Sequence, residues 1–433
     1  MFYRSVNRVD NRGVDRVERA LVINTAIEAG GKAAALLIAA ASLALAARYL
    51  SPDGFGRYQL ALAYFTVFGV AVDLGLTTIL VRESSRNRAI EARLAGIVLA
   101  LRLTASTVVM MVALAAAWLL PYDRALRGAI AIAGVGVFCA WIQAPLAAPF
   151  QTRLRMMPAV AAELAGRLAG LAAMVIVLSL DAGLSGVVAA TSLAALITLV
   201  ATAFAVHGVV PIQLVADRVA WRHVLAAGLP LGVAAALDIL YVRIDVFILA
   251  IYRPFYEVGL YSMAYRVYEL LLLVPGFFIR SLFPVLAREM AEGRTLIRQR
   301  IQRATFLVIA AGLPTVAAGV ALAPQLVRLV GGEAFAGATV VLRLLLAAAL
   351  FSALNSLARH IIIAGGEAGR AVWLYAAGLI INVAVNVALI PRYGAPAAAL
   401  AMVASETAML GGHLFLLTTR PFPGRPPTRF AAE

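Results

Sequence analysis

The chain has 433 residues, of which 63% are apolar and 14% are charged, and its formal net charge at pH 7 is +15. Because a soluble domain has about 25% charged residues, this composition excludes a water-soluble enzyme, a disordered chain and a disulfide scaffold. It predicts an all-α integral membrane protein that crosses the bilayer many times. The basic excess is typical of cytoplasmic loops, so nucleic acid is not an expected partner. Cys139 is the only cysteine, which excludes a cysteine-rich metal site.

Taken in chain order, the apolar runs have close to the ~20 residues that cross the hydrocarbon core as a helix. The sequence predicts twelve of them, at about residues 22–47, 58–80, 94–119, 128–150, 159–180, 184–206, 224–250, 258–286, 304–330, 338–363, 371–390 and 396–418. The connections between them are short and leave no room for a soluble domain. Arginine is concentrated in alternate connections, which predicts that both termini are cytoplasmic.

Short motifs recur in the same order in the two halves of the chain. Gly-x-Tyr opens the second expected segment at 56–58 and the eighth at 259–261, and Arg-Glu ends these segments at 82–83 and 288–289. Six segments return the chain to the same side, so we expect parallel repeats, an architecture typical of transporters. The predicted regions are a cytoplasmic basic leader at 1–20, an N-lobe at 21–210, an interlobe loop at 211–223, a C-lobe at 224–418 and a cytoplasmic tail at 419–433.

Asp73, Asp238 and Asp245 lie inside expected membrane segments, each without a cation one helical turn away. An ionised side chain costs roughly 2.5–3.5 kcal/mol near the bilayer centre on insertion scales. Burial favours the neutral form of a carboxyl group, which can then carry a proton. We therefore expect these residues to couple transport to a proton or another cation. The alternative is an ion pair between helices.

Four basic residues, Lys32, Arg243, Arg266 and Arg280, lie on the first, seventh and eighth expected segments. If these segments meet at the axis between the halves, the four side chains form a basic cluster. Guanidinium groups match phosphate oxygens in two-point contacts, so the cluster predicts a phosphate-bearing, anionic substrate. Glu269 follows Arg266 by three residues, so an internal ion pair is the alternative for that arginine.

The motifs of several common enzyme classes are missing from the sequence. Gly30-Gly31-Lys32 lacks the first glycine of a phosphate-binding loop, and Ala33 stands where that loop requires Ser or Thr. Neither an H-E-x-x-H zinc motif nor a G-x-S-x-G nucleophile motif is present. We therefore expect no catalytic residue, no metal, no cofactor and no enzymatic activity.

Six stretches carry a resemblance to a known family. They are ARYLSPDGFGRY at 47–58, DLGL at 73–76, RIDVFIL at 243–249, VGLY at 258–261, LFP at 282–284 and IPRYG at 390–394. Over about residues 20–418 the chain resembles bacterial polysaccharide-biosynthesis flippases, including O-antigen flippases, of the multidrug/oligosaccharidyl-lipid/polysaccharide (MOP) transporter superfamily.

The resemblance implies two six-helix lobes, as in multidrug (MATE) transporters, around a cavity that opens to each side of the membrane in turn. It implies that an undecaprenyl-diphosphate-linked oligosaccharide moves from the inner to the outer leaflet of the bacterial cytoplasmic membrane, with the diphosphate on cavity Arg and Lys side chains. Lipid II flippases usually have two more segments, which favours exopolysaccharide or O-antigen units here. The expected partners are this lipid, membrane lipids, H⁺ or Na⁺, and a polysaccharide polymerase or co-polymerase.

Two alternative functions remain open. A drug/cation antiporter of the same fold would need an acidic cavity, which the basic residues on the first, seventh and eighth segments disfavour. A membrane glycan polymerase or ligase usually needs a sizeable outer loop to hold its acceptor, and the outer loops expected here are short.

Overall fold

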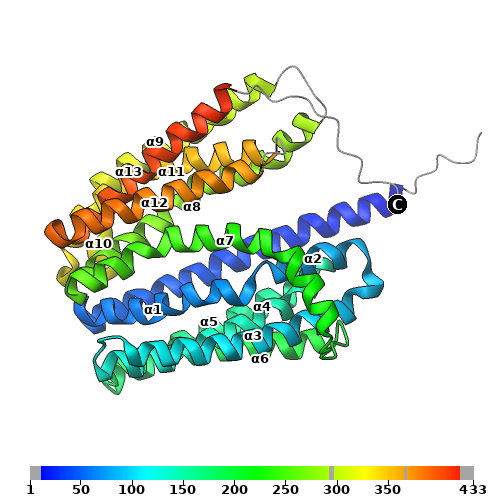
Figure 1. Cartoon of the computed structure of the whole chain (residues 1–433), viewed down its shortest axis with the longest axis horizontal. Coiled ribbons are helices and arrows are strands. Elements are labelled where there is room, and N and C mark those ends of the chain that lie inside the picture. The colour runs from blue at the N-terminus through cyan, green and yellow to red at the C-terminus, as the bar shows by residue number, and fades with distance from the viewer. Residues whose placement is uncertain (1–10, 292–296, 365–367, 420–433) are drawn as a thin grey trace, which may run out of the picture. The chain divides into compact units, whose positions relative to one another are not determined.

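The computed structural model describes residues 11–291, 297–364 and 368–419, and every regular element within them is helical (Figure 1). The elements are α1 (Asn11–Asp73), α2 (Leu76–Arg86), η1 (Arg88–Ile90), α3 (Glu91–Leu119), α4 (Arg124–Thr152), α5 (Met156–Ser179), α6 (Gly183–His207), α7 (Arg218–Tyr252), α8 (Phe255–Ala291), α9 (Ile297–Ala321), α10 (Ala323–Gly331), η2 (Glu333–Phe335), α11 (Ala338–Ala364), α12 (Ala368–Tyr393) and α13 (Ala395–Thr419). Among the described residues, nine helices are long and apolar enough to cross a membrane. The all-helical, multi-pass architecture is thus confirmed, while the count of twelve segments and the orientation of the termini stay predictions.

Large apolar side chains lie on the outside of these helices. Leu119 of α3 is 88% exposed, Phe204 of α6 is 86% exposed and Trp373 of α12 is 75% exposed. Exposed apolar surface on this scale is unfavourable in water, whereas acyl chains solvate it. The surface therefore agrees with the composition in placing the helices in a bilayer.

Helix α1 joins the first expected segment to the second through a sharp bend. The bend lies at Ser51, whose φ is 57° and ψ is 175°, and Pro52 follows it directly. Proline has no N–H to donate and its ring clashes with the preceding turn. These two residues therefore separate two helical stretches within α1.

The second expected segment, 58–80, is not one continuous helix. Helix α1 ends at Asp73, and α2 begins three residues later. Between them, Leu74 has a φ of 38° and Gly75 a φ of 75°. Glycine adopts this left-handed conformation at little cost, whereas leucine does so rarely. The break therefore places a strained residue directly after one of the predicted ion-coupling carboxylates.

The ninth expected segment, 304–330, is also divided. Helix α9 ends at Ala321, before the end of this expected segment. Helix α10 then begins, with Pro324 in its first turn. Proline fits the first turn of a helix but breaks a helix interior. This proline accounts for the division.

The chain forms two compact units, which we call unit 1 and unit 2. Unit 1 comprises Met1–Ala46 and Tyr64–Ala235, and unit 2 comprises Ala47–Ala63 and Ala236–Glu433. Helices α1 and α7 therefore contribute residues to both units. The predicted leader, lobes, interlobe loop and tail stay predictions.

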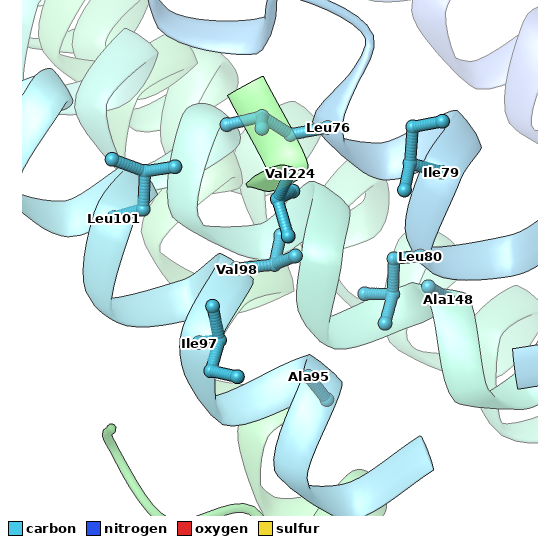
Figure 2. Close-up of a cluster of buried hydrophobic side chains, with 9 residues drawn as sticks. All are labelled: Leu76, Ile79, Leu80, Ala95, Ile97, Val98, Leu101, Ala148 and Val224. Carbon is cyan, nitrogen blue, oxygen red and sulfur yellow. The ribbon is translucent and has the colours of Figure 1, made fainter. Parts of the chain in front are cut away.

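In unit 1, α6 packs against α4 and α5, and α3 packs against α4. Figure 2 shows a core at one end of this bundle, where α2 lies against its neighbours. The core residues are Leu76, Ile79, Leu80, Ala95, Ile97, Val98, Leu101, Ala148 and Val224. Ile79 and Leu80 follow Leu76 by three and four residues, so the three side chains share one face of α2. Their burial anchors this short helix.

In unit 2, α11 packs against α8, α9 and α13, and α12 packs against α13. A core of apolar residues joins three of these helices, with members Ile279, Ala304, Val308, Ala353, Leu357 and Ile361. The short stretch of α1 in this unit crosses α8 closely, because Gly56 leaves no room for a Cβ atom against the backbone carbonyl of Phe255. The Arg57 guanidinium lies 4.7 Å from the centre of the Phe255 ring.

Candidate functional site

Two of the four predicted substrate-binding residues share one carboxylate in unit 2. Glu269 of α8 lies 2.8 Å from Arg266 of the same helix and 3.7 Å from Arg243 of α7. Arg266 also donates to the side-chain oxygen of Gln59 at 3.4 Å. The expected internal pair of Arg266 and Glu269 is confirmed, and its extension to Arg243 leaves one net positive charge on the three groups.

These arginines retain donors for a further anion. A guanidinium has five N–H groups in a planar fork, and the contacts above use only part of this capacity. The Arg243 side chain is 22% exposed and that of Arg266 is 30% exposed, so both groups are reachable. The Arg243 guanidinium also lies 5.9 Å from the centre of the Tyr265 ring, which restricts its position.

The other two predicted substrate-binding residues are Lys32 and Arg280. Lys32 is an exposed residue of α1 in unit 1, whereas Arg243 and Arg266 belong to unit 2. The side chain of Arg280 lies outside the described part of the molecule. A cluster of all four cations therefore stays a prediction.

Asp73, at the end of α1, forms an ion pair with Arg102 of α3 in unit 1. Arg102 also donates to the Thr77 hydroxyl oxygen at 2.7 Å, and Thr77 donates to Asp73 at 2.9 Å. The Arg102 side chain is 5% exposed. These contacts join the end of α1 to the start of α2 across the helix break, so the interhelical ion pair weighed for Asp73 is present.

Asp238 of α7 is also paired with an arginine. Its carboxylate lies 3.6 Å from the guanidinium of Arg359 on α11, and that guanidinium lies 5.0 Å from the centre of the Tyr375 ring. Sequence spacing alone does not predict this partner, because Arg359 lies on a distant segment. The pair neutralises one more of the predicted ion-coupling residues.

Asp245 of α7 has a different environment. It is buried in unit 2, where Tyr261 donates to one carboxylate oxygen at 2.5 Å and the Asn386 amide donates to the other at 2.6 Å. Asn386 also donates to the Asn382 side-chain oxygen at 2.8 Å, and its own side-chain oxygen is buried without a hydrogen-bond donor. The bond from Asn386 to Asp245 therefore joins α12 to α7.

Among the described residues, no salt bridge joins the Asp245 carboxylate to a cation. In the same part of the chain, no group of three His, Cys, Asp or Glu side chains could hold a metal ion. Its neighbours are instead neutral amides and a phenol. A carboxylate beside amide oxygens can hold a proton or a hard monovalent cation. Of the three predicted ion-coupling residues, Asp245 alone is held by neutral partners.

A second buried carboxylate, Glu406 of α13, is not among the residues predicted for the site from the sequence. It accepts hydrogen bonds from the hydroxyl of Tyr241 at 3.1 Å and from the amide of Asn355 at 2.7 Å. His413 of the same helix contacts the Asn355 side-chain oxygen through Nδ1 at 2.9 Å. Unit 2 therefore contains two carboxylates that neutral groups hold.

A repeated spacing in the sequence marks these positions. Polar residues occur at 238, 241 and 245 on α7 and at 352, 355 and 359 on α11, in each case three and then four residues apart. This spacing places each set on one helix face. Residues 406 and 413 on α13 share a face for the same reason. Such stripes within apolar segments are the signal by which Glu406 could have been found.

Comparison with known proteins places the chain in a fold and a family. Similar solved structures include the lipid II flippase MurJ in an inward closed conformation (12% identity, TM-score 0.74, covering 92% of this chain and 88% of that chain). They also include an inward-facing multidrug resistance MATE family transporter of the MOP superfamily (17% identity, TM-score 0.72, covering 88% and 93%) and a MOP superfamily transporter from Pyrococcus furiosus (17% identity, TM-score 0.66, covering 92% and 94%). No curated protein matches the chain.

These likenesses show a fold shared with MurJ and MATE transporters and confirm that part of the prediction. The family model described as "Polysaccharide biosynthesis protein" matches residues 21–290, which is more than half of the chain. With its helical fold and its apolar surface beside this match, the chain belongs to the polysaccharide biosynthesis protein family.

Proposed function

We propose that the chain is a flippase that moves undecaprenyl-diphosphate-linked oligosaccharide units from the inner to the outer leaflet of the bacterial cytoplasmic membrane. The units would serve the synthesis of exopolysaccharide or O antigen. Transport would occur by alternating access and would be coupled to an ion. Family membership supports a role in polysaccharide synthesis, and the fold supports transport.

One observation carries the choice of an anionic substrate. Arg243 and Arg266, which lie on expected membrane segments, share Glu269 and remain partly exposed. A buried excess of positive charge is costly without a compensating anion. A diphosphate would supply that anion and accept several N–H groups of each guanidinium. A cationic drug would meet repulsion at the same place, which disfavours the antiporter alternative.

Glu269 takes the place of the substrate anion when no substrate is bound. Without substrate, the glutamate neutralises part of the charge on the two arginines. A diphosphate carries more negative charge than a carboxylate, so it would compete with Glu269 for both guanidinium groups. Binding would therefore change the contacts between α7 and α8, and a change in contacts is what a ligand needs to shift a conformational equilibrium.

We assign the coupling ion to Asp245 rather than to Asp73 or Asp238. The latter two already have arginine partners. Asp245 is held by Tyr261 and Asn386, so the arrival or loss of a proton or Na⁺ changes the net charge there. Such a change biases two conformations only through a difference in ion affinity between them.

The test begins with deletion of the gene and measurement of lipid-linked oligosaccharide on each leaflet of spheroplasts, using a membrane-impermeant sugar-modifying enzyme. We expect complete units on the inner leaflet and loss of polymer. Normal polymer would contradict the proposal and point to drug efflux. Accumulation of single units on the outer leaflet would contradict it too, and would indicate a polymerase or ligase.

Complementation then tests the site. Arg243→Ala and Arg266→Ala should each fail to restore polymer, because each removes part of the diphosphate site. The matched control is Arg392→Ala, at an exposed arginine in the last turn of α12, which should restore polymer. Protein levels in the membrane are measured for all three. If both Arg243→Ala and Arg266→Ala restore polymer at normal levels, the assignment of the site is wrong.

A further inference from the structure

Glu406 is a carboxylate in the middle of a membrane-spanning helix with no cation bound to it. Its residue exposure is 5%, and among the described residues no salt bridge joins it to an arginine, lysine or histidine. Neutral groups surround it instead. An ionised carboxylate in such a place is costly, and the cost disappears when the group takes up a proton.

The charged and titratable groups that face Glu406 come from every helix around it. They are Tyr241 of α7, Tyr268 of α8, Arg359 of α11 and Tyr375 of α12, with Asp238 of α7 bound to Arg359 and His413 of α13 bound to Asn355. Arg359 is the one cation among them that carries a fixed charge, and it is paired with Asp238 at 3.6 Å. The charge of Glu406 is therefore left without a dedicated counter-ion.

The hydrogen bonds around Glu406 can satisfy the carboxyl group in both of its protonation states. When it is ionised, Tyr241 donates to Oε1 at 3.1 Å, and Ser405 donates to the backbone oxygen of Ala401 at 2.9 Å. When Oε1 carries a proton, it can donate to the Tyr241 oxygen, and Tyr241 can turn its own proton to Ser405 Oγ at 3.0 Å. The hydroxyl groups rotate, and no heavy atom needs to move.

Asn355 and His413 fix the other side of the carboxyl group. The Asn355 amide nitrogen donates to Glu406 Oε2 at 2.7 Å and to the Glu406 backbone oxygen at 2.8 Å. Its side-chain oxygen can only accept, so His413 Nδ1, at 2.9 Å, carries a proton. His413 is therefore a positioning residue that holds the amide nitrogen of Asn355 toward Glu406.

The contrast with Asp245 shows why the proton belongs at Glu406. The Asp245 oxygens accept from Tyr261 and from an amide nitrogen. In the described part of the chain, Tyr261 has no hydrogen bond to a second hydroxyl group, whereas Tyr241 has one to Ser405. A chain of hydroxyl groups that can reverse its direction, and so accommodate a proton, therefore occurs beside Glu406.

We propose that Glu406 is a proton-binding site of unit 2, separate from the ion site at Asp245, with Tyr241 and Ser405 as the hydroxyl chain that accommodates the proton. The uptake needs no other reactant, since one proton binds Oε1 and one O–H bond forms. That this proton exchanges during transport rests on the proposed function. The binding of the proton does not.

Infrared difference spectroscopy of the purified full-length protein tests proton binding directly, because a protonated carboxyl group has a carbonyl stretch that the carboxylate lacks. A titration from acidic to alkaline pH should show loss of one such band, and Glu406→Gln should lack that band at every pH. Glu406→Gln keeps the shape of the side chain, so we expect it to fold. A spectrum in which Glu406→Gln removes no titrating band would overturn the proposal.

Two further variants should shift the midpoint of this band in opposite directions, each by about one pH unit, the size that loss of one hydrogen bond produces. Tyr241→Phe removes a donor to the ionised form, so the proton is held to higher pH. Ser405→Ala removes the acceptor that Tyr241 needs when Glu406 is protonated, so the proton leaves at lower pH. Thr407→Ala, on the same helix, removes an exposed hydroxyl that bonds only to Val403 and should leave the midpoint unchanged.

Shifts in the same direction for Tyr241→Phe and Ser405→Ala would contradict the hydroxyl chain. The same proteins are then compared in the polymer assay. If the band titrates as expected and the wild-type gene has no part in oligosaccharide transport, the proposed function fails while the proton site stands. If transport is present and no band titrates, the proton site fails alone.

Discussion

Two carboxylates of unit 1 are held by cations, whereas the two most deeply buried carboxylates of unit 2 are held by neutral groups. In unit 1, Asp73 is paired with Arg102, and Glu91 of α3 accepts two hydrogen bonds from Arg153 at 2.8 and 2.9 Å. In unit 2, Asp245 and Glu406 are held by phenol, amide and hydroxyl groups. A carboxylate with a fixed cation stabilises one structure, whereas one without a cation is free to exchange an ion.

The largest loss of stability is expected for Arg153→Ala. Glu91 is 1% exposed and would keep only Thr152 as a side-chain partner in Arg153→Ala. Leaving a buried charge without its partner should lower the free energy of unfolding by about 3 kcal/mol. Chemical denaturation in detergent measures the change. Arg155→Ala, at an exposed neighbour, should change the free energy by less than about 0.5 kcal/mol, and an equal effect of both variants would contradict the assignment.

A smaller loss is expected for Asp73→Asn. Arg102 is 5% exposed and would lose its counter-ion, whereas the Asp73 side chain is 40% exposed. Because water already screens the aspartate, the loss should be about 2 kcal/mol, below that of a fully buried pair. Thermal unfolding of the purified protein measures it. If Asp73→Asn is as stable as wild type and instead removes the ion dependence of transport, the two units do not differ as described.

Glu257 is a carboxylate of unit 2 that, unlike Asp245 and Glu406, is paired with a cation. It lies 2.6 Å from Arg253 and accepts the backbone N–H of Ala395, in the first turn of α13, at 2.9 Å. Glu257→Ala should cost about 1 kcal/mol, as expected for loss of a helix cap, and should leave the ion dependence of transport unchanged. Thermal unfolding and the polymer assay measure the two quantities. Altered ion dependence would show that a cation partner does not identify a structural carboxylate.

Asp245→Asn should have the smallest effect on stability, below about 1 kcal/mol. Asn386 can rotate its amide so that its oxygen, which has no donor now, accepts from the new side chain. The effect should appear in function instead, as loss of the dependence of transport on the coupling ion. Unfolding and transport are measured on the same preparation. A large loss of stability with normal ion dependence would make Asp245 a structural residue.

The sequence predicts the all-helical, multi-pass architecture, because the length of an apolar run is a local property. The break at Leu74 is not visible in the same way, since a leucine before an isolated glycine is compatible with a helix. The contacts of Arg102 with Asp73 and Thr77 span this break, and they join residues that are distant in sequence. The partners of Glu406 are marked by polar spacing on α7, α11 and α13, but spacing within a helix does not state which helices face one another.

The assignment of Ala47–Ala63 to unit 2 has a consequence for biosynthesis. During translation this stretch leaves the ribosome about 200 residues before Phe255 and the rest of α8, against which Gly56 packs. Until the later helices are inserted, the face of the early segment that packs against α8 therefore has no protein partner. A chain that stops at its midpoint lacks residues 218–235 of unit 1 and most of unit 2, so neither unit is complete.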